Sequence, residues 1–184
     1  SEAAEDGVSF IEGMRLLADI GIRLRIYDDA EFLLESCVEF EPDNVRARSD
    51  YLKILNRKGK FEQALKQARH LSEHDPENTV YQLALANALT GLGRFDEGIA
   101  LYEQCLEQSA NKAGTLVLLG HARKAVGDID GAIAAYEEAG RIKPDYGDAY
   151  WSLANTKTYR FAPGSLEHIQ RCAADEGITA DDRV

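Results

Sequence analysis

The sequence predicts an all-α fold in which antiparallel helix pairs stack into a solenoid, and two observations support this. First, the 184 residues include many Ala, Leu, Glu and Gln but only 4 Pro, and β-branched residues are sparse. This composition favours helices over strands. Second, a period of 34 residues runs through most of the chain. One helix pair cannot bury its apolar face alone, so repeated pairs must stack on one another.

Three prolines define the period. Pro42 and Pro76 are 34 residues apart, and Pro144 follows two periods later, with Ala110 at the position between them. At the same offset, an apolar residue precedes a small one in the four segments that begin at Tyr27, Phe61, Phe95 and Ile129. We therefore expect an N-terminal tail or helix start at 1–10, followed by four helix pairs at 11–44, 45–78, 79–112 and 113–146.

The turn within each pair is predicted near Arg25, Gly59, Gly93 and Gly127, because Gly supplies the positive φ that ends a helix. Small residues recur where the two helices of a pair approach each other closely. They are Ala18, Ala86 and Gly120 in the first helices and Ala30, Ala64, Gly98 and Ala132 in the second helices. Leu52 replaces the small residue in the second pair, which we therefore expect to be slightly splayed.

Residues 11–146 resemble the tetratricopeptide repeat. The shared pattern is Leu-Ala or Leu-Gly in the first helix, Gly at the turn, an aromatic residue with Ala in the second helix, and a late Pro. The resemblance implies a right-handed superhelix whose first helices line a concave groove for a protein or peptide segment. It also implies an interaction module that has no catalysis of its own and no cofactor.

A degenerate fifth unit with a capping helix is expected at 147–178. Its first helix starts in register at Tyr150 and Leu153, but Phe161-Ala-Pro-Gly stands where the turn belongs, so a second helix can begin only near Gly164 or Ser165. If that helix closes the array, Trp151 is expected to be largely buried. Residues 179–184 resemble the start of a further helix that is cut short, and the alternative is a disordered tail.

The segments AYWSLANTKTYRF and ADDRV resemble the end of the repeat array in bacterial proteins whose tetratricopeptide repeats precede a sulfotransferase domain. The resemblance covers residues 147–184 and implies that such a domain, which uses the sulfate donor PAPS, would follow. The sequence itself contains no phosphate-cradling loop after a strand, so we expect this chain to be inert. The alternative function is therefore a substrate-recruiting or regulatory part of a PAPS-dependent sulfotransferase.

Composition excludes several other classes of function. The net charge of -11 opposes binding to nucleic acid, and no apolar run is long enough to cross a membrane. Cys37, Cys105 and Cys172 include no CxxC pair, which argues against a disulfide framework or a zinc site and favours the cytoplasm. His70 and His74 lie one helical turn apart without an evident third ligand, so no metal is expected.

The predicted groove is formed by one stripe of each first helix. Basic residues are concentrated at 45–78, where eight Lys or Arg stand against five Asp or Glu. This favours an extended acidic peptide as the partner, with Asn side chains holding its backbone. The alternatives are a solvated helix face that binds nothing and, for the single Trp, packing against the following helix. The predicted groove residues are Arg15, Arg46, Lys53, Asn56, Arg57, Asn87, His121, Lys124, Trp151 and Asn155.

Overall fold

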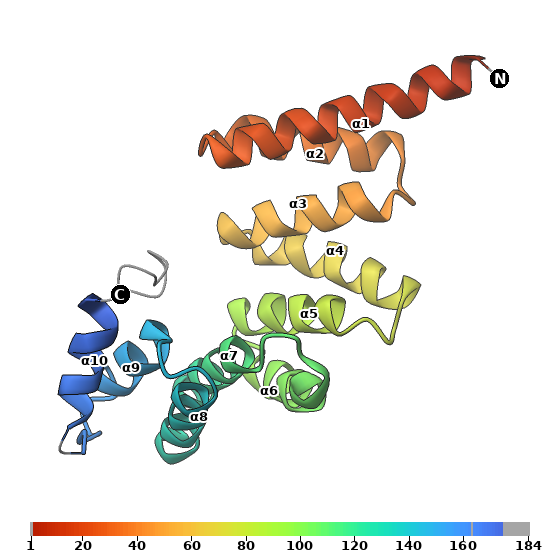
Figure 1. Cartoon of the computed structure of the whole chain (residues 1–184). Helices are drawn as coiled ribbons and strands as arrows, with labels where there is room; N and C mark the ends of the chain where they lie inside the picture. The colour runs from red at the N-terminus through yellow and green to blue at the C-terminus, as the bar shows by residue number, and fades with distance from the viewer. Residues whose placement is uncertain (1, 163, 175–184) are drawn as a thin grey trace. The chain divides into compact units, whose positions relative to one another are not determined.

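The structure is a computed structural model that describes residues 2–162 and 164–174. Within these ranges the regular elements are all helical (Figure 1). They are α1 (Glu2–Arg23), α2 (Tyr27–Phe40), α3 (Val45–Arg57), α4 (Phe61–His74), α5 (Thr79–Gly91), α6 (Phe95–Cys105), the 3₁₀ helix η1 (Leu106–Gln108), α7 (Lys112–Ala125), α8 (Ile129–Ile142), α9 (Gly147–Ala154) and α10 (Ser165–Ala174). The predicted fold class, an all-α solenoid of antiparallel helix pairs, is confirmed.

The chain divides into two compact units, Ser1–Gly93 and Arg94–Val184. Unit 1 contains α1 to α5, and unit 2 contains α6 to α10. The division falls at the turn of the third predicted repeat rather than between two repeats.

All four predicted turns lie where the sequence places them. The backbone has positive φ at Arg25 (62°), Gly59 (68°), Gly93 (77°) and Gly127 (88°). At the first turn the Ile26 N–H donates to the carbonyl of Gly21 at 2.8 Å, which satisfies a carbonyl at the end of α1. Arg25 thus adopts the left-handed conformation that Gly adopts in the other three turns, at a modest cost in backbone strain.

Asn side chains at recurring positions cap the starts of three first helices. The Asn44 side chain accepts from the N–H of Ala47 at 3.0 Å, and the Asn78 side chain accepts from Val80 at 3.1 Å. Asn111 caps α7 in the same way, one residue before the strict period. Each cap satisfies an N–H group that the helix itself leaves unpaired. Each also follows the turn after a second helix, so the chain reverses and starts the next pair within a few residues.

Side chains that follow two of the caps bind the preceding turn. Arg48 donates to the carbonyl of Pro42, and Gln82 donates to the carbonyl of Pro76 at 3.0 Å. Tyr150 does the same to Pro144 at 3.0 Å. These donors share one position of the 34-residue period, and so do their proline acceptors. The proline thus ends the second helix and also presents a carbonyl that fixes the first turn of the next helix.

The small residues lie in the core as predicted. Ala18, Ala30, Ala64, Ala86 and Ala132 are fully buried. A Cβ added at Gly120 would lie 2.4 Å from the ring of Tyr136, so α7 and α8 approach as closely as Gly allows. The cysteines Cys37 and Cys105 are also buried, as their positions among small residues predict.

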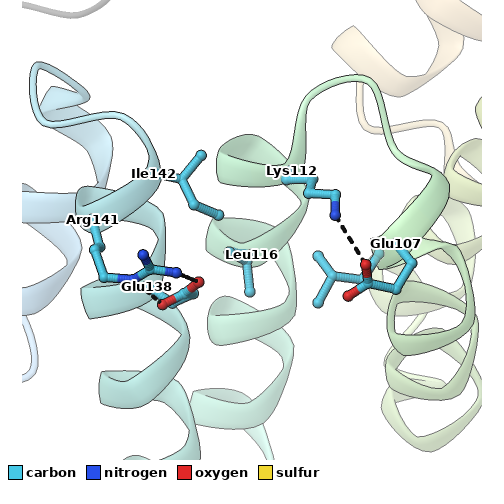
Figure 2. A pocket seen from close by; sticks show the side chains of 7 residues that line it. Glu107, Lys112, Leu116, Glu138, Arg141 and Ile142 are labelled. Atoms are coloured by element: carbon cyan, nitrogen blue, oxygen red, sulfur yellow. Dashed lines mark hydrogen bonds and ion pairs between the residues drawn. The ribbon is translucent and has the colours of Figure 1, made fainter.

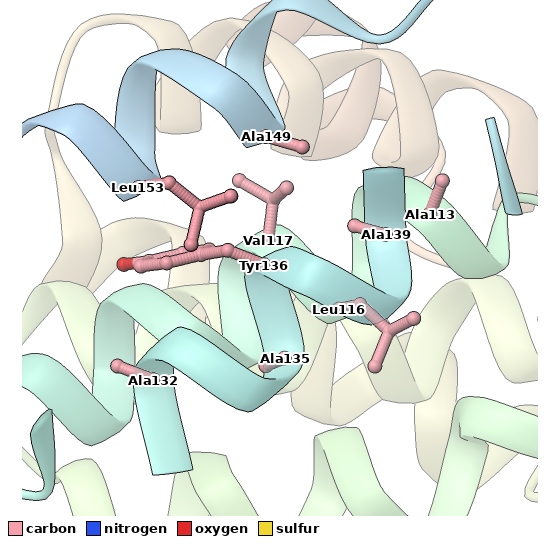
Figure 3. Packing of buried hydrophobic residues seen from close by; sticks show 9 residues of the cluster. All are labelled: Ala113, Leu116, Val117, Ala132, Ala135, Tyr136, Ala139, Ala149 and Leu153. Carbon is pink, nitrogen blue, oxygen red and sulfur yellow. The ribbon is translucent and has the colours of Figure 1, made fainter. Parts of the chain in front are cut away.

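The core of unit 2 surrounds the Tyr136 ring (Figure 3). Val117 of α7 lies on one side of this ring, and Ala149 and Leu153 of α9 extend the cluster. The described part of α9 thus packs as a first helix of a fifth pair would. Its buried face consists of Ala149, Ser152 and Leu153.

Trp151 departs from expectation. The prediction that it is largely buried is wrong, because its side chain is 53% exposed. At 100° per residue, Trp151 projects from the side of α9 opposite Ala149 and Leu153, which occupy the core. The second helix of the fifth unit, α10, does begin at Ser165 as predicted. Its role as a cap remains a prediction, and the predicted further helix at 179–184 lies outside the described residues.

Candidate functional site

Nine of the ten predicted groove residues lie on first helices, as expected, and Asn155 directly follows one. The ten residues fall into two sets. The unit 1 stripe comprises Arg15 on α1, Arg46, Lys53, Asn56 and Arg57 on α3, and Asn87 on α5. The unit 2 stripe comprises His121 and Lys124 on α7, Trp151 on α9, and Asn155 directly after α9.

A pocket of about 260 Å³ opens in unit 1 between α1 and α3. Its residues are Asp19 and Ile22 from α1, with Asp50, Lys53, Ile54 and Arg57 from α3. Two of the predicted stripe residues therefore line a real concavity. The pocket also contains two carboxylates and two isoleucines, so its surface is apolar in part and carries both signs of charge.

Asp50 links two of the predicted cations. Its carboxylate accepts from Arg15 at 2.8 Å and from Lys53 at 2.9 Å, and Arg15 also binds Glu12 at 2.7 Å. Arg15 is 19% exposed in these pairs, whereas Lys53 remains 69% exposed. A pair with such an exposed partner contributes little to stability. Arg15 is therefore fixed in place, while Lys53 retains access to solvent.

The charges around Asp50 determine its protonation. Partial burial alone would raise the pKa of its carboxyl group, but the hydrogen bonds from Lys53 and Arg15 outweigh burial and hold the pKa below the usual value. Asp50 is thus ionised at neutral pH. Its negative charge partly neutralises Arg15 and Lys53 of the unit 1 stripe.

The other stripe residues of unit 1 differ in their exposure to solvent and in their hydrogen bonds. Arg57 donates to the hydroxyl of Tyr27 at 2.8 Å and lies over its ring, with 5.3 Å between the guanidinium carbon and the ring centroid. Arg46 is exposed, and Asn87 is half-buried. Asn56 is half-buried with its Oδ1 atom enclosed, and this oxygen has no hydrogen-bond partner among the described residues. An enclosed oxygen of this kind is not accessible to a ligand in this conformation.

The unit 2 stripe connects α7 to α9. The Nε2 atom of His121 lies 3.1 Å from the hydroxyl of Ser152, and its ring packs edge-on against Tyr136 with centroids 5.6 Å apart. Lys124 donates to the carbonyl of Asn155 at 3.0 Å. Two of the predicted residues therefore serve partly to hold α9 in place.

Electrostatics keep His121 neutral. Loss of water around its ring lowers the pKa, and Lys124 lowers it further, although Asp148 acts in the opposite direction. The imidazole is therefore uncharged at neutral pH. Trp151 and Asn155 are exposed, so the unit 2 stripe presents an aromatic ring and an amide to solvent.

A second pocket, of about 280 Å³, lies in unit 2 outside the predicted stripe (Figure 2). Leu106, Leu116 and Ile142 form its apolar part. The pairs Lys112–Glu107, at 3.0 Å, and Arg141–Glu138, at 2.7 Å, flank it on either side.

The second pocket lies near the turn between η1 and α7, where the proline and the side chain that donates to its carbonyl are both replaced. Ala110 occupies the proline position, and Leu116 occupies the position of the donors Arg48, Gln82 and Tyr150. In this repeat α6 ends early at Cys105 and continues as η1. The turn therefore takes another course, and Leu116 faces the pocket instead of binding a proline carbonyl.

The sequence analysis missed two residues that bind members of the stripes. Asp50 stands three residues before Lys53, a spacing that indicates an ion pair on one helix face. Ser152 directly follows Trp151 and carried no comparable signal, because its contact with His121 joins residues 31 positions apart.

Two further classes of site are absent from the described parts of the chain. No group of three or more His, Cys, Asp or Glu is arranged there to hold a metal ion. None of the described helices is long and apolar enough to cross a membrane.

Comparison with solved structures identifies similar folds. The structure of MamA MSR-1 is 22% identical, with a TM-score of 0.65 over 73% of this chain and 77% of that chain. MamA 41-end from Desulfovibrio magneticus RS-1 is 14% identical, with a TM-score of 0.67 over 73% and 76% of the two chains. TTC0263, a thermophilic TPR protein in Thermus thermophilus, is 18% identical, with a TM-score of 0.64 over 89% and 97%.

No curated protein matches the sequence. The family model of the tetratricopeptide repeat matches residues 26–88 and 89–156. These segments include three of the four predicted turns, and the first turn, at Arg25, precedes them by one residue. Together they cover more than half of the chain. The chain therefore belongs to the tetratricopeptide repeat family.

Proposed function

We propose that this chain is a protein interaction module that binds an extended polypeptide segment along its first helices, without catalysis of its own. The observation that carries the proposal is the α1/α3 pocket, which combines an apolar base of Ile22 and Ile54 with charged side chains of both signs. A peptide side chain inserted there would bury apolar surface, and its neighbours would meet the charges.

Lys53 is an accessible cation of the pocket, because its side chain is 69% exposed and its pair with Asp50 is weak. An acidic peptide residue would compete with Asp50 for this ammonium group. We therefore propose a partner segment with an apolar anchor beside an acidic residue.

The unit 2 stripe supports the same function. Trp151 is an exposed aromatic residue beside the amide of Asn155, and exposed aromatic residues are frequent anchors in interfaces. Trp151 is also the sole Trp of the chain. A shift of its fluorescence to shorter wavelength on adding a peptide would therefore report burial at this stripe alone.

Charge reversal tests the proposal directly. We expect Lys53→Glu with Arg57→Glu to weaken binding of a peptide selected on the wild-type chain at least about tenfold and to reduce its salt dependence. Calorimetry at two salt concentrations measures both. Lys66→Glu with Arg69→Glu is the matched control, since it makes the same change in charge on α4, away from the pocket. Equal affinity of the wild type and the groove variant would refute binding at this pocket.

Asp50→Asn sharpens the test. Removal of this carboxylate releases Lys53 and Arg15 from their shared anion. If the partner segment is acidic, its affinity should increase, by about two- to tenfold for a gain of up to about 1.4 kcal/mol. A decrease would indicate that Asp50 itself contacts the peptide.

The alternative proposal is that the chain recruits a substrate for, or regulates, a PAPS-dependent sulfotransferase. Its support is the resemblance of residues 147–184, of which 175–184 lie outside the described residues. The gene sequence beyond Val184 tests it: a sulfotransferase domain there would support it, and an unrelated continuation would refute it.

A further inference from the structure

The second pocket, called the η1/α8 pocket from here on, has an apolar lining that the repeat does not require. Its three apolar residues come from three successive elements: Leu106 from η1, Leu116 from α7 and Ile142 from α8. One period earlier, the equivalent positions all hold polar residues, namely Ser72, Gln82 and Gln108. Two periods earlier they hold Val38, Arg48 and His74. The apolar surface is therefore a property of this repeat boundary and not of the fold.

Part of this apolar surface is open to solvent. Ile142, at the end of α8, is 43% exposed, and Leu106 is half-buried, whereas Leu116 is 5% exposed. An apolar ligand group that covers such a surface gains binding energy in proportion to the area removed from water. The cavity volume of about 280 Å³ lies just below the range of about 300–1,000 Å³ that is typical of sites for small molecules. Its size therefore suits one inserted side chain.

Side chains of opposite charge stand on opposite sides of the pocket. Glu107, on the η1 side, is 86% exposed, and Arg141, on the α8 side, is 73% exposed. Their partners are less open, since Lys112 is 39% exposed and Glu138 is 41% exposed. Figure 2 shows the two ion pairs on either side of Leu116. The more accessible charges are therefore negative beside η1 and positive beside α8.

Both ion pairs can accommodate a further charged group. Pairs with such exposed members contribute little to stability, so a ligand that competes for them causes little loss. Glu138 accepts from Nε and Nη2 of Arg141, and Nη1 has no hydrogen-bond partner among the described residues. Glu107 accepts from Lys112 through Oε2 at 3.0 Å. Each open charge can thus bind a ligand group of the opposite sign.

We propose that the η1/α8 pocket binds a large apolar side chain of a partner polypeptide, flanked by an acidic residue on one side and a basic residue on the other. The apolar side chain contacts Leu106, Leu116 and Ile142. The acidic residue pairs with Arg141 and the basic residue with Glu107, so the order of charges orients the segment across the pocket. This site shares no residue with the α1/α3 pocket or the unit 2 stripe, so the failure of one proposal leaves the other intact.

The test is an NMR titration of the isotope-labelled full chain with a short peptide. The peptide has a central Leu, with two Glu on one side and two Lys on the other, and we expect saturable shifts at the backbone amides around Leu106 and Ile142. Leu106→Ser with Ile142→Gln introduces the polar residues of the preceding repeat and should weaken binding at least about tenfold. Val80→Ser with Val126→Gln is the matched control. It changes two exposed apolar residues elsewhere and should leave the affinity within about twofold.

Two further arms test the apolar contact. Ile142→Gln alone is the milder variant, because Ile142 is partly exposed, and it should weaken binding at least about threefold. Circular dichroism verifies that each variant retains the fold. A peptide with Ser in place of Leu should produce no saturable shift. Leucine blocked at both ends should bind at least about threefold more weakly than the peptide, and equal binding would overturn the proposal by identifying a small-molecule site.

A charge arm tests the orientation. At physiological salt the mixed peptide should bind at least about threefold more tightly than peptides with four Glu or four Lys. Glu107→Lys makes both open charges positive, so the four-Glu peptide should then bind most tightly. Glu73→Lys is the matched control, since Glu73 occupies the same position of the period on α4 and the net charge changes equally.

Three outcomes of the charge arm would overturn the proposal. The first is an unchanged order of peptides in Glu107→Lys, and the second is the same change of order in Glu73→Lys. The third is tightest binding of the four-Lys peptide to the wild-type chain, because the net charge of -11 would then explain the attraction.

Sedimentation velocity tests a second copy of the chain as the occupant. The wild-type chain should remain monomeric at micromolar concentration. If it dimerises, and Leu106→Ser with Ile142→Gln abolishes the dimer, then the η1/α8 pocket is a contact between copies and the proposed partner is wrong.

Discussion

The pair α3/α4 in unit 1 and the pair α7/α8 in unit 2 occupy equivalent positions of the same period, yet they are held together differently. In unit 1, Arg48 donates to Gln67 and to Pro42, and Leu52 stands at the site of close approach. In unit 2 the equivalent positions hold Leu116, Ala135 and Gly120, and the ring of Tyr136 lies directly against Gly120. The α7/α8 interface is the more extensive of the two.

The difference shows that the period specifies where helices meet but not what joins them. In unit 2 the small Gly120 lies against the large Tyr136, whereas in unit 1 the equivalent positions hold the large Leu52 and the small Ala68. The α3/α4 pair also has a polar contact from Arg48 to Gln67. The bridge in unit 1 is imperfect, because Nε of Arg48 is buried without a partner among the described residues. Burial accordingly lowers the pKa of this guanidinium.

The largest expected effect on stability comes from truncating Leu52, the large residue at the helix crossing of unit 1. Leu52 is 4% exposed, so Leu52→Ala removes a buried side chain and should lower the free energy of unfolding by about 2–5 kcal/mol. Leu118→Ala is the control, since Leu118 is 37% exposed on α7 and should cost less than about 1 kcal/mol. Urea denaturation measures both. Similar losses would mean that Leu52 makes no special contribution to its pair.

The next effect tests the small residue of unit 2. Gly120→Ala places a Cβ 2.4 Å from the fully buried ring of Tyr136, so the ring or the helix must move. We expect a loss of about 1–3 kcal/mol, even though Ala favours helix over Gly. Gly13→Ala makes the same change in α1 with no atom within 4 Å of the new methyl group. It should stabilise the protein by up to about 1 kcal/mol, and a stabilising Gly120→Ala would contradict the packing described.

The smallest effect concerns the polar bridge. Arg48→Leu introduces the residue type found at the equivalent position of unit 2, Leu116. It leaves Gln67 and the Pro42 carbonyl without their donor and should lower the free energy of unfolding by about 1–2 kcal/mol. Adding Gln67→Ala then gives unit 1 the same apolar combination that Leu116 and Ala135 form in unit 2. The double variant should recover part of that loss, with a coupling of about 0.5–1 kcal/mol between the two sites in a double-mutant cycle. If the effects of the two substitutions simply add, then Arg48 and Gln67 do not stabilise the pair through their mutual contact.

The sequence by itself determined the local features, because a period of 34 residues fixes which positions recur. It located the turns at Arg25, Gly59, Gly93 and Gly127, the small residues at the helix crossings, and the family. It also placed the stripe residues on first helices. These features follow from backbone conformation and residue size, which each short segment encodes on its own.

Only the tertiary structure decided which charges meet and which faces are covered. Asp50 binds Arg15 across 35 positions, and Ser152 meets His121 across 31, so no local pattern could pair them. Trp151 is exposed because the core at α9 is filled by Ala149 and Leu153. Burial and pairing depend on neighbours that folding brings together, and the same apolar residue is interior at Ile54 but exposed at Ile20, where no preceding helix is described.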